Sequence, residues 1–129
     1  MVSVSRAALA VEFARAGEHR HALDVFAECL EAYARHGNYV HAVTSLRNIV
    51  SVLAAVGDDH GAAVIGLATT SDQLRTSYGR EAEQLADVLA ATARRIGPVA
   101  FAECRLAADE LSVEATTQFA AARVALLGH

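Results

Sequence analysis

The chain has 129 residues, of which 53% are apolar and 20% are charged, and its net charge is −4. This length and composition exclude a disordered chain and are sufficient to bury a core without metal or disulfide staples. The negative charge argues against a nucleic-acid-binding surface, because phosphate contacts need clustered cations. A single proline, few aromatic residues and many alanines favour packed helices over sheet. The sequence contains no secretory signal and no apolar run of bilayer length, so we expect a cytoplasmic protein that does not bind membranes.

Glycines divide the chain into amphipathic segments of similar length. Gly17, Gly37 and Gly57 recur every twenty residues, and Gly79 and Gly97 follow at similar spacing. A glycine at such a place readily adopts the left-handed conformation that ends a helix. The pattern predicts one all-α domain over residues 1–129. Its seven expected helices are 3–16, 19–36, 39–56, 59–78, 81–96, 98–109 and 113–127.

Apolar residues in these segments recur at the three- and four-residue steps of an amphipathic helix. In the second segment they are Ala22, Phe26, Cys29 and Tyr33, and in the third they are Val43, Leu46, Ile49, Val50 and Leu53. The opposite side of the second segment is acidic and is expected to face water. After Gly57, Asp58 offers a carboxylate that can cap the next helix. The pattern therefore predicts two helical hairpins, over residues 3–36 and 39–78, followed by packing helices over 81–127.

Small and aromatic residues around the glycines carry a resemblance to tetratricopeptide repeats. The first unit has Leu9, Ala10 and Phe13 before Gly17 and Ala22, Phe26 and Cys29 after it. The second unit has Ile49 and Leu53 before Gly57 and Ala62 after it, and then departs from the pattern. The spacing is longer than in that family, so the resemblance implies lengthened tetratricopeptide-like hairpins.

A second resemblance covers nearly the whole chain. It is carried by the run Leu46, Arg47 and Asn48, the glycine and Ala-rich helix that follow, and the motifs Gly97-Pro-Val-Ala-Phe101 and Leu111-Ser-Val-Glu-Ala115. In this order they resemble the C-terminal helical-repeat region of large bacterial transcriptional regulators of the LuxR type and of the adenylate-cyclase-linked, ATPase-containing type. The resemblance implies a protein-interaction or signal-sensing module that is not itself catalytic. ATPase, cyclase and DNA-binding segments would then lie elsewhere in a longer parent chain.

One polar group in the third segment is a candidate binding site. Thr44, Arg47, Asn48 and Ser51 lie on the helix face opposite the apolar stripe. In tetratricopeptide-like stacks this face lines the concave groove, and the resemblance implies that Asn48 clasps the backbone of a bound peptide. The alternative is that these four residues simply face water.

Cysteines and histidines give no catalytic or metal site. Cys29 and Cys104 fall on apolar faces, which favours buried reduced thiols over a disulfide. His19, His21 and His60 fall in predicted turns, and we interpret them as solvated because zinc needs three or four convergent ligands. The acidic stripe of Asp24, Glu28 and Glu31 is likewise interpreted as a solvated face. We therefore expect no cofactor, no metal and no enzymatic activity.

The first segment is apolar around much of its circumference and needs cover on several sides. Val4, Ala8 and Val11 lie on one face of it. A preceding repeat in a longer parent would supply the cover, and in this chain alone a second copy would, which predicts a homodimer. The expected partners are a protein or peptide, or other domains of the parent regulator. A free-standing scaffold that binds a peptide in its groove is the alternative function.

Overall fold

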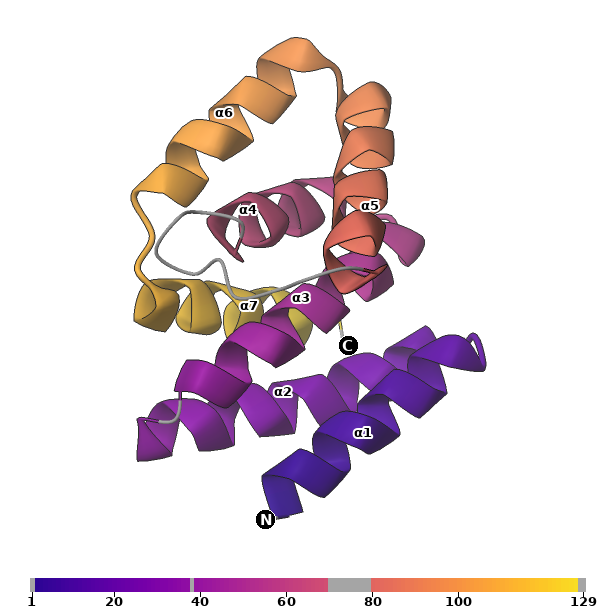
Figure 1. The fold of residues 1–129 in the computed structure, drawn as a ribbon, viewed down its shortest axis with the longest axis vertical. Helices are drawn as coiled ribbons and strands as arrows, with labels where there is room; N and C mark the ends of the chain where they lie inside the picture. Colours follow the sequence, from indigo (N-terminus) through magenta and orange to yellow (C-terminus); the bar gives the residue numbers. More distant parts are fainter. Residues whose placement is uncertain (1, 38, 70–79, 128–129) are drawn as a thin grey trace.

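The computed structural model describes residues 2–37, 39–69 and 80–127, with the backbone alone at 2–7, 39–41, 43–44 and 80–82. The described residues form seven α-helices and no strand (Figure 1), which confirms the all-α prediction. The helices are α1 (Val2–Arg15), α2 (His19–His36), α3 (Tyr39–Ala55), α4 (Asp59–Thr69), α5 (Arg80–Ile96), α6 (Pro98–Asp109) and α7 (Val113–Leu127). Their bounds agree with the predicted ones to within a residue, except that the predicted end of the fourth helix, 70–78, lies outside the described residues.

Left-handed glycines end the first three helices, as the spacing predicted. Gly37 has φ 65°, and its backbone N–H donates to the carbonyls of the preceding turn of α2. Gly57 has φ 94°, and the N–H of Asp58 returns to the Leu53 carbonyl at 2.9 Å. This pattern satisfies carbonyls that would otherwise have no partner at the end of α3. Gly97 also ends a helix, because it follows α5 with φ 90° and its N–H donates to the Ala93 carbonyl at 2.9 Å. It precedes Pro98 as well and so begins α6.

The helices pair as two hairpins and are then closed by the C-terminal helices. α1 packs along α2, α3 packs along α4, and α2 and α3 join the two pairs. α5 and α6 pack on α4, while α7 crosses back to α2, α3 and α4 (Figure 1). In a linear repeat array each unit contacts only its neighbours. The contact between α7 and α2 instead closes the chain around α4.

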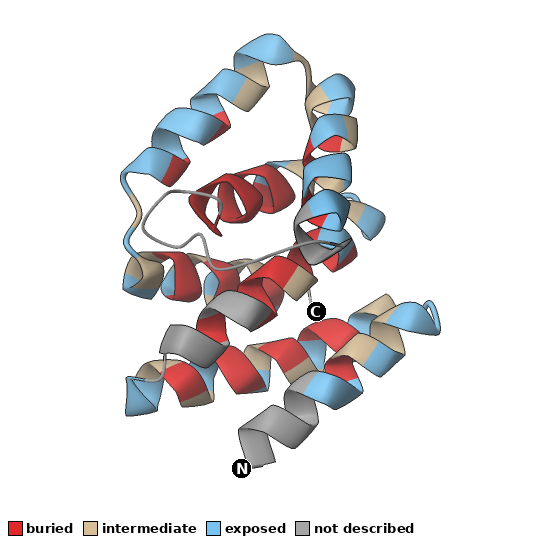
Figure 2. Ribbon diagram, in the orientation of Figure 1, coloured by how far each residue is buried: buried red, intermediate tan, exposed pale blue. Residues whose placement is uncertain are grey.

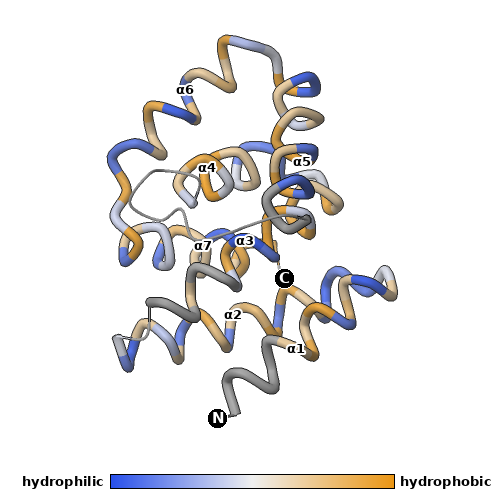
Figure 3. The backbone as a smooth tube through the Cα atoms, in the orientation of Figure 1, coloured by the Kyte–Doolittle hydropathy of each residue, from blue (hydrophilic) through white to orange (hydrophobic). Residues whose placement is uncertain are grey.

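Burial is concentrated in α4. Every residue from Gly61 to Thr69 is buried, whereas α6 buries only Cys104 and Ala108 (Figure 2). Hydrophobic residues follow one another along most of α4, so it has no polar side to turn toward water (Figure 3). A helix apolar on all sides must be covered on all sides. The surrounding helices α3, α5, α6 and α7 provide that cover.

Gly66 allows α5 to approach α4 closely. A Cβ at this position would lie 2.6 Å from Cδ2 of Leu89 on α5, too close for van der Waals contact. The absent side chain thus leaves room for the leucine to pack against the helix backbone. None of the described helices combines the length and the apolar character needed to span a membrane.

Candidate functional site

A cavity of about 510 Å³ lies among α1, α2, α3 and α5. We call it the α1–α3–α5 cavity. Its lining residues are Val11, Ala14 and Arg15 of α1, Phe26 of α2, Arg47, Asn48, Val50 and Ser51 of α3, and Gln84, Leu85, Asp87 and Val88 of α5. Three of the four residues predicted as the binding site therefore line one cavity. The side chain of the fourth, Thr44, lies outside the described residues.

Asn48 and Ser51 occupy successive turns of α3, so both side chains reach the same part of the cavity. Asn48 is half-buried and Ser51 is exposed. The Ser51 hydroxyl donates to the Asn48 backbone carbonyl at 3.2 Å. This hydrogen bond holds the Ser51 hydroxyl against its own helix and involves only the backbone of Asn48.

The structure places Arg47 differently from the sequence-based expectation of an open polar face. The residue is only 8% exposed, and its Nη2 donates to the Thr69 carbonyl at 2.9 Å. That carbonyl belongs to the last turn of α4, where a cation is favoured by the helix dipole. The C-terminal end of α4 thus covers one side of Arg47, and the guanidinium contributes to the cavity wall as part of the internal packing.

The remaining lining residues divide into an apolar floor and a polar rim. Phe26, Val50 and Leu85 are buried at the floor, and Val11, Ala14 and Val88 are partly buried beside them. Exposed Arg15, Ser51, Gln84 and Asp87 form the rim. The α5 wall could not be assigned from sequence, because its place against α3 depends on how the second hairpin packs.

The predicted self-association residues have different environments. Val11 is partly buried, packs against the core and lines the cavity. Ala8 is exposed, and the neighbouring Leu9 is 47% exposed. The side chain of Val4 lies outside the described residues. Self-association through this face of α1 stays a prediction.

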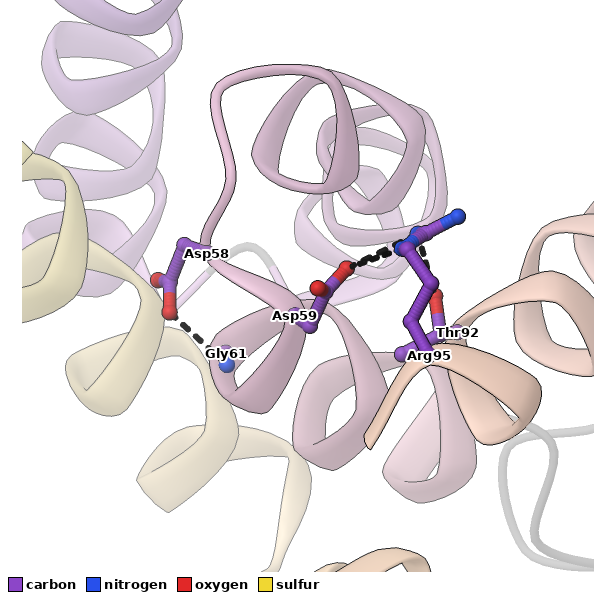
Figure 4. A network of polar contacts seen from close by, with 5 residues as sticks. All are labelled: Asp58, Asp59, Gly61, Thr92 and Arg95. Atoms are coloured by element: carbon purple, nitrogen blue, oxygen red, sulfur yellow. Dashed lines mark hydrogen bonds and ion pairs between the residues drawn. The ribbon is translucent and has the colours of Figure 1, made fainter. Parts of the chain in front are cut away.

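The N-terminal end of α4 carries a second polar cluster, which we call the α4 clamp. Asp58 accepts the Gly61 N–H at 3.1 Å and thereby caps the helix. Its carboxylate also accepts two hydrogen bonds from Arg123 of α7, at 2.7 and 2.8 Å. Asp59 pairs with Arg95 of α5 at 2.8 Å, and Arg95 also donates to Thr92 at 3.2 Å (Figure 4). Two consecutive aspartates thus tie two C-terminal helices to α4.

The environment of Asp58 shifts its pKa. Burial disfavours the charged carboxylate, but the hydrogen bonds from Arg123 and Gly61 and the nearby positive charge outweigh it, so the pKa of Asp58 lies below its ordinary value. The paired side chains are 31% exposed for Arg123 and 7% for Asp58. The ionised pair is therefore largely shielded from solvent and belongs to the packing of α7 onto α4.

Cys29 and Cys104 are both buried and are not joined in a disulfide, as predicted. Burial raises the pKa of the Cys104 thiol, and the charge of Glu103 adds to the shift, so this thiol is a poor nucleophile. The sequence did not indicate that His60 would approach it: His60 Nδ1 lies 3.4 Å from Cys104 Sγ. His60 is exposed, as expected for a solvated residue, and this contact links α4 to α6. Among the described residues no group of three or more His, Cys, Asp or Glu is placed to hold a metal ion.

Comparisons with protein-family models, with curated proteins and with solved structures found no match. The case for a binding site is therefore made by the shape, burial and charge of the cavity. The resemblance to bacterial regulators and to tetratricopeptide repeats stays a prediction.

Proposed function

We propose that this chain is a non-catalytic protein-interaction or signal-sensing module, and that the α1–α3–α5 cavity receives a segment of its partner. The observation that carries the proposal is that Asn48 and Ser51 of α3 line one cavity of about 510 Å³ together with residues of α1 and α5, while the packed Arg47 forms part of its wall. In the sequence, Asn48 and Ser51 lie on one polar face of the third helix. The cavity supports the interpretation of that face as a binding face.

The chemistry of the lining supports binding more than catalysis. Ligand sites combine an apolar lining with a few polar groups that fix orientation, in cavities of roughly 300–1,000 Å³. The buried floor of Phe26, Val50 and Leu85 and the exposed polar rim follow this pattern. Catalysis would call for a nucleophile or general base held by a partner, and none of the described lining residues forms such a pair.

The wider role that we propose is that of a terminal helical-repeat region in a bacterial transcriptional regulator. The support is the order of the sequence motifs that resemble the LuxR-type and adenylate-cyclase-linked regulators. In that setting the cavity would bind another domain of the parent or a signalling partner. A free-standing tetratricopeptide-like scaffold is the alternative, and it uses the same cavity. An ATPase, cyclase or DNA-binding segment in the natural open reading frame would favour the regulator, and its absence would favour the scaffold.

Site-specific cross-linking tests the binding role. A photoreactive amino acid in place of Ser51 should cross-link a defined partner, because this residue lies at the cavity rim. The same amino acid in place of Glu103, which is exposed on α6, is the matched control and should not. The identified partner should then bind the purified chain, with about tenfold lower affinity for the double variant Asn48→Ala, Ser51→Ala. Equal adducts at both positions, or an unchanged affinity, would overturn the proposal.

A further inference from the structure

Three helices, α1, α3 and α5, supply most of the lining of the α1–α3–α5 cavity. α1 lies against α2 and α3, whereas α5 lies against α3, α4 and α6. α3 is therefore the element shared by the two outer walls, and Phe26 of α2 closes the floor. Each wall includes lining residues three positions apart, which lie on one side of their helix. Examples are Val11 and Ala14 on α1 and Leu85 and Val88 on α5. Such rows form the ridges and grooves into which another helix packs.

The distribution of polar and apolar side chains in the lining of the α1–α3–α5 cavity favours binding of a helix over binding of an extended peptide. The floor is formed by apolar side chains, and the polar side chains lie at the exposed rim. An extended chain would bring backbone N–H and C=O groups against this apolar floor, where they would find no partners. A helix satisfies its own backbone and presents only side chains. Its apolar stripe would lie on the floor and its polar flanks would meet the rim.

The rim carries opposite charges on its two outer walls. Arg15 belongs to α1 and Asp87 to α5, and both are exposed. Arg15 contacts Glu12 of its own helix at 3.4 Å, but both side chains are more than two-thirds exposed, so this pair contributes little and is easily exchanged. No described residue forms an ion pair with Asp87. A docked helix therefore meets a cation on one flank and an anion on the other.

We propose that the α1–α3–α5 cavity binds an amphipathic helix whose two polar edges carry opposite charges, an acidic edge beside Arg15 and a basic edge beside Asp87. This inference rests on the proposed binding function and specifies its partner. A helix turned end to end exchanges its two edges. The rim charges consequently fix the direction in which such a helix docks, and they disfavour a helix whose two edges carry the same charge.

Three designed peptides test this recognition. Each has about four helical turns and apolar residues at positions i, i+3, i+4 and i+7. One peptide has a glutamate edge and a lysine edge, one has two lysine edges and one has two glutamate edges. Fluorescence anisotropy of labelled peptides measures their affinities for the wild-type chain and for Arg15→Glu and Asp87→Arg. Circular dichroism verifies that each variant folds.

The wild-type chain should prefer the mixed-edge peptide by about tenfold, which corresponds to about 1.4 kcal/mol. Arg15→Glu makes both flanks acidic and should shift the preference to the two-lysine peptide. Asp87→Arg makes both flanks basic and should shift it to the two-glutamate peptide. Glu103→Arg changes the net charge as much as Asp87→Arg but lies on α6, and it should leave the ranking of the three peptides unchanged.

Failure of this inference differs from failure of the proposed function. If the ranking of peptides is the same in the wild-type chain, Arg15→Glu and Asp87→Arg, recognition by the rim charges is wrong. If no peptide binds but the partner cross-linked at Ser51 does, the occupant is not an amphipathic helix and the binding function stands. If neither peptides nor a cross-linked partner bind, both proposals are wrong.

Discussion

The N-terminal end of α4 and the α1–α3–α5 cavity both bring charged side chains from distant parts of the chain together, but they use them differently. In the α4 clamp, Asp58 and Asp59 each bind an arginine from another helix. At the cavity rim, Arg15 forms an ion pair with Glu12 of its own helix, and no described residue forms an ion pair with Asp87. The charges of the clamp are paired with one another, whereas the two rim charges on α1 and α5 are exposed.

Burial explains why the two regions should respond differently to substitution. Exposed ion pairs contribute about 0–1 kcal/mol, because water and salt screen them. Removing one partner of a buried pair costs about 3–5 kcal/mol, because the other charge is left without compensation. The pair of Asp58 and Arg123 is close to a buried pair, whereas the pair of Arg15 and Glu12 is an exposed one. Substitutions in the clamp should therefore affect stability, and substitutions at the rim should affect binding.

The largest effect is expected for Arg123→Ala, which removes the arginine that pairs with the buried Asp58 carboxylate and leaves it, among the described residues, the hydrogen bond from the Gly61 N–H. We expect the free energy of unfolding to fall by about 3 kcal/mol. Urea denaturation followed by circular dichroism measures it. In the double variant Asp58→Ala, Arg123→Ala no charge remains uncompensated, so it should lose less than the sum of the single changes. A loss below about 0.5 kcal/mol for Arg123→Ala would show that the clamp does not hold α7.

Arg47→Ala and Asn48→Ala compare a buried residue of the cavity lining with a half-buried one. Arg47→Ala removes a charged donor from the Thr69 carbonyl at the end of α4, and about 2 kcal/mol of stability should be lost. Asn48→Ala changes a half-buried side chain on the neighbouring position and should remain within about 0.5 kcal/mol of the wild type. The same denaturation experiment compares them. Equal losses of stability would contradict the conclusion that Arg47 belongs to the internal packing and Asn48 does not.

The smallest effect is expected for the dependence of the free energy of unfolding on pH in the acidic range. Because the pKa of Asp58 is lowered in the folded protein, the unfolded chain binds a proton at a higher pH than the folded chain does. The stabilisation from ionised Asp58 is thus complete above the unfolded pKa of about 3.9 and is lost as the pH falls through the folded pKa. The difference in unfolding free energy between the wild type and Asp58→Asn should be constant from pH 7 to 5 and should narrow below pH 4. A constant difference down to pH 2 would contradict the assignment.

Much of the local structure followed from sequence, because the signals that determine it are local. The left-handed glycines Gly17, Gly37 and Gly57 end helices where their spacing predicted, and the Asp58 cap forms within three residues. Among the predicted site residues, Asn48 and Ser51 could be grouped because they lie one turn apart on α3. The burial of Arg47 was missed, since it depends on α4 reaching the same side of α3.

The periodicity of apolar residues and the positions of the glycines determined where the helices begin and end, because a helix is built from contacts between residues three and four positions apart. They also determined which pairs form hairpins, since short connections leave consecutive helices side by side. The tertiary structure alone decided that α7 returns to α2, that Arg123 reaches Asp58, and that α5 supplies one wall of the cavity. These contacts join residues separated by tens of positions. Such contacts depend on which apolar helix faces pack together. In this chain many faces are rich in alanine and similar in shape, so the pairing of distant helices is determined by how all seven described helices pack at once.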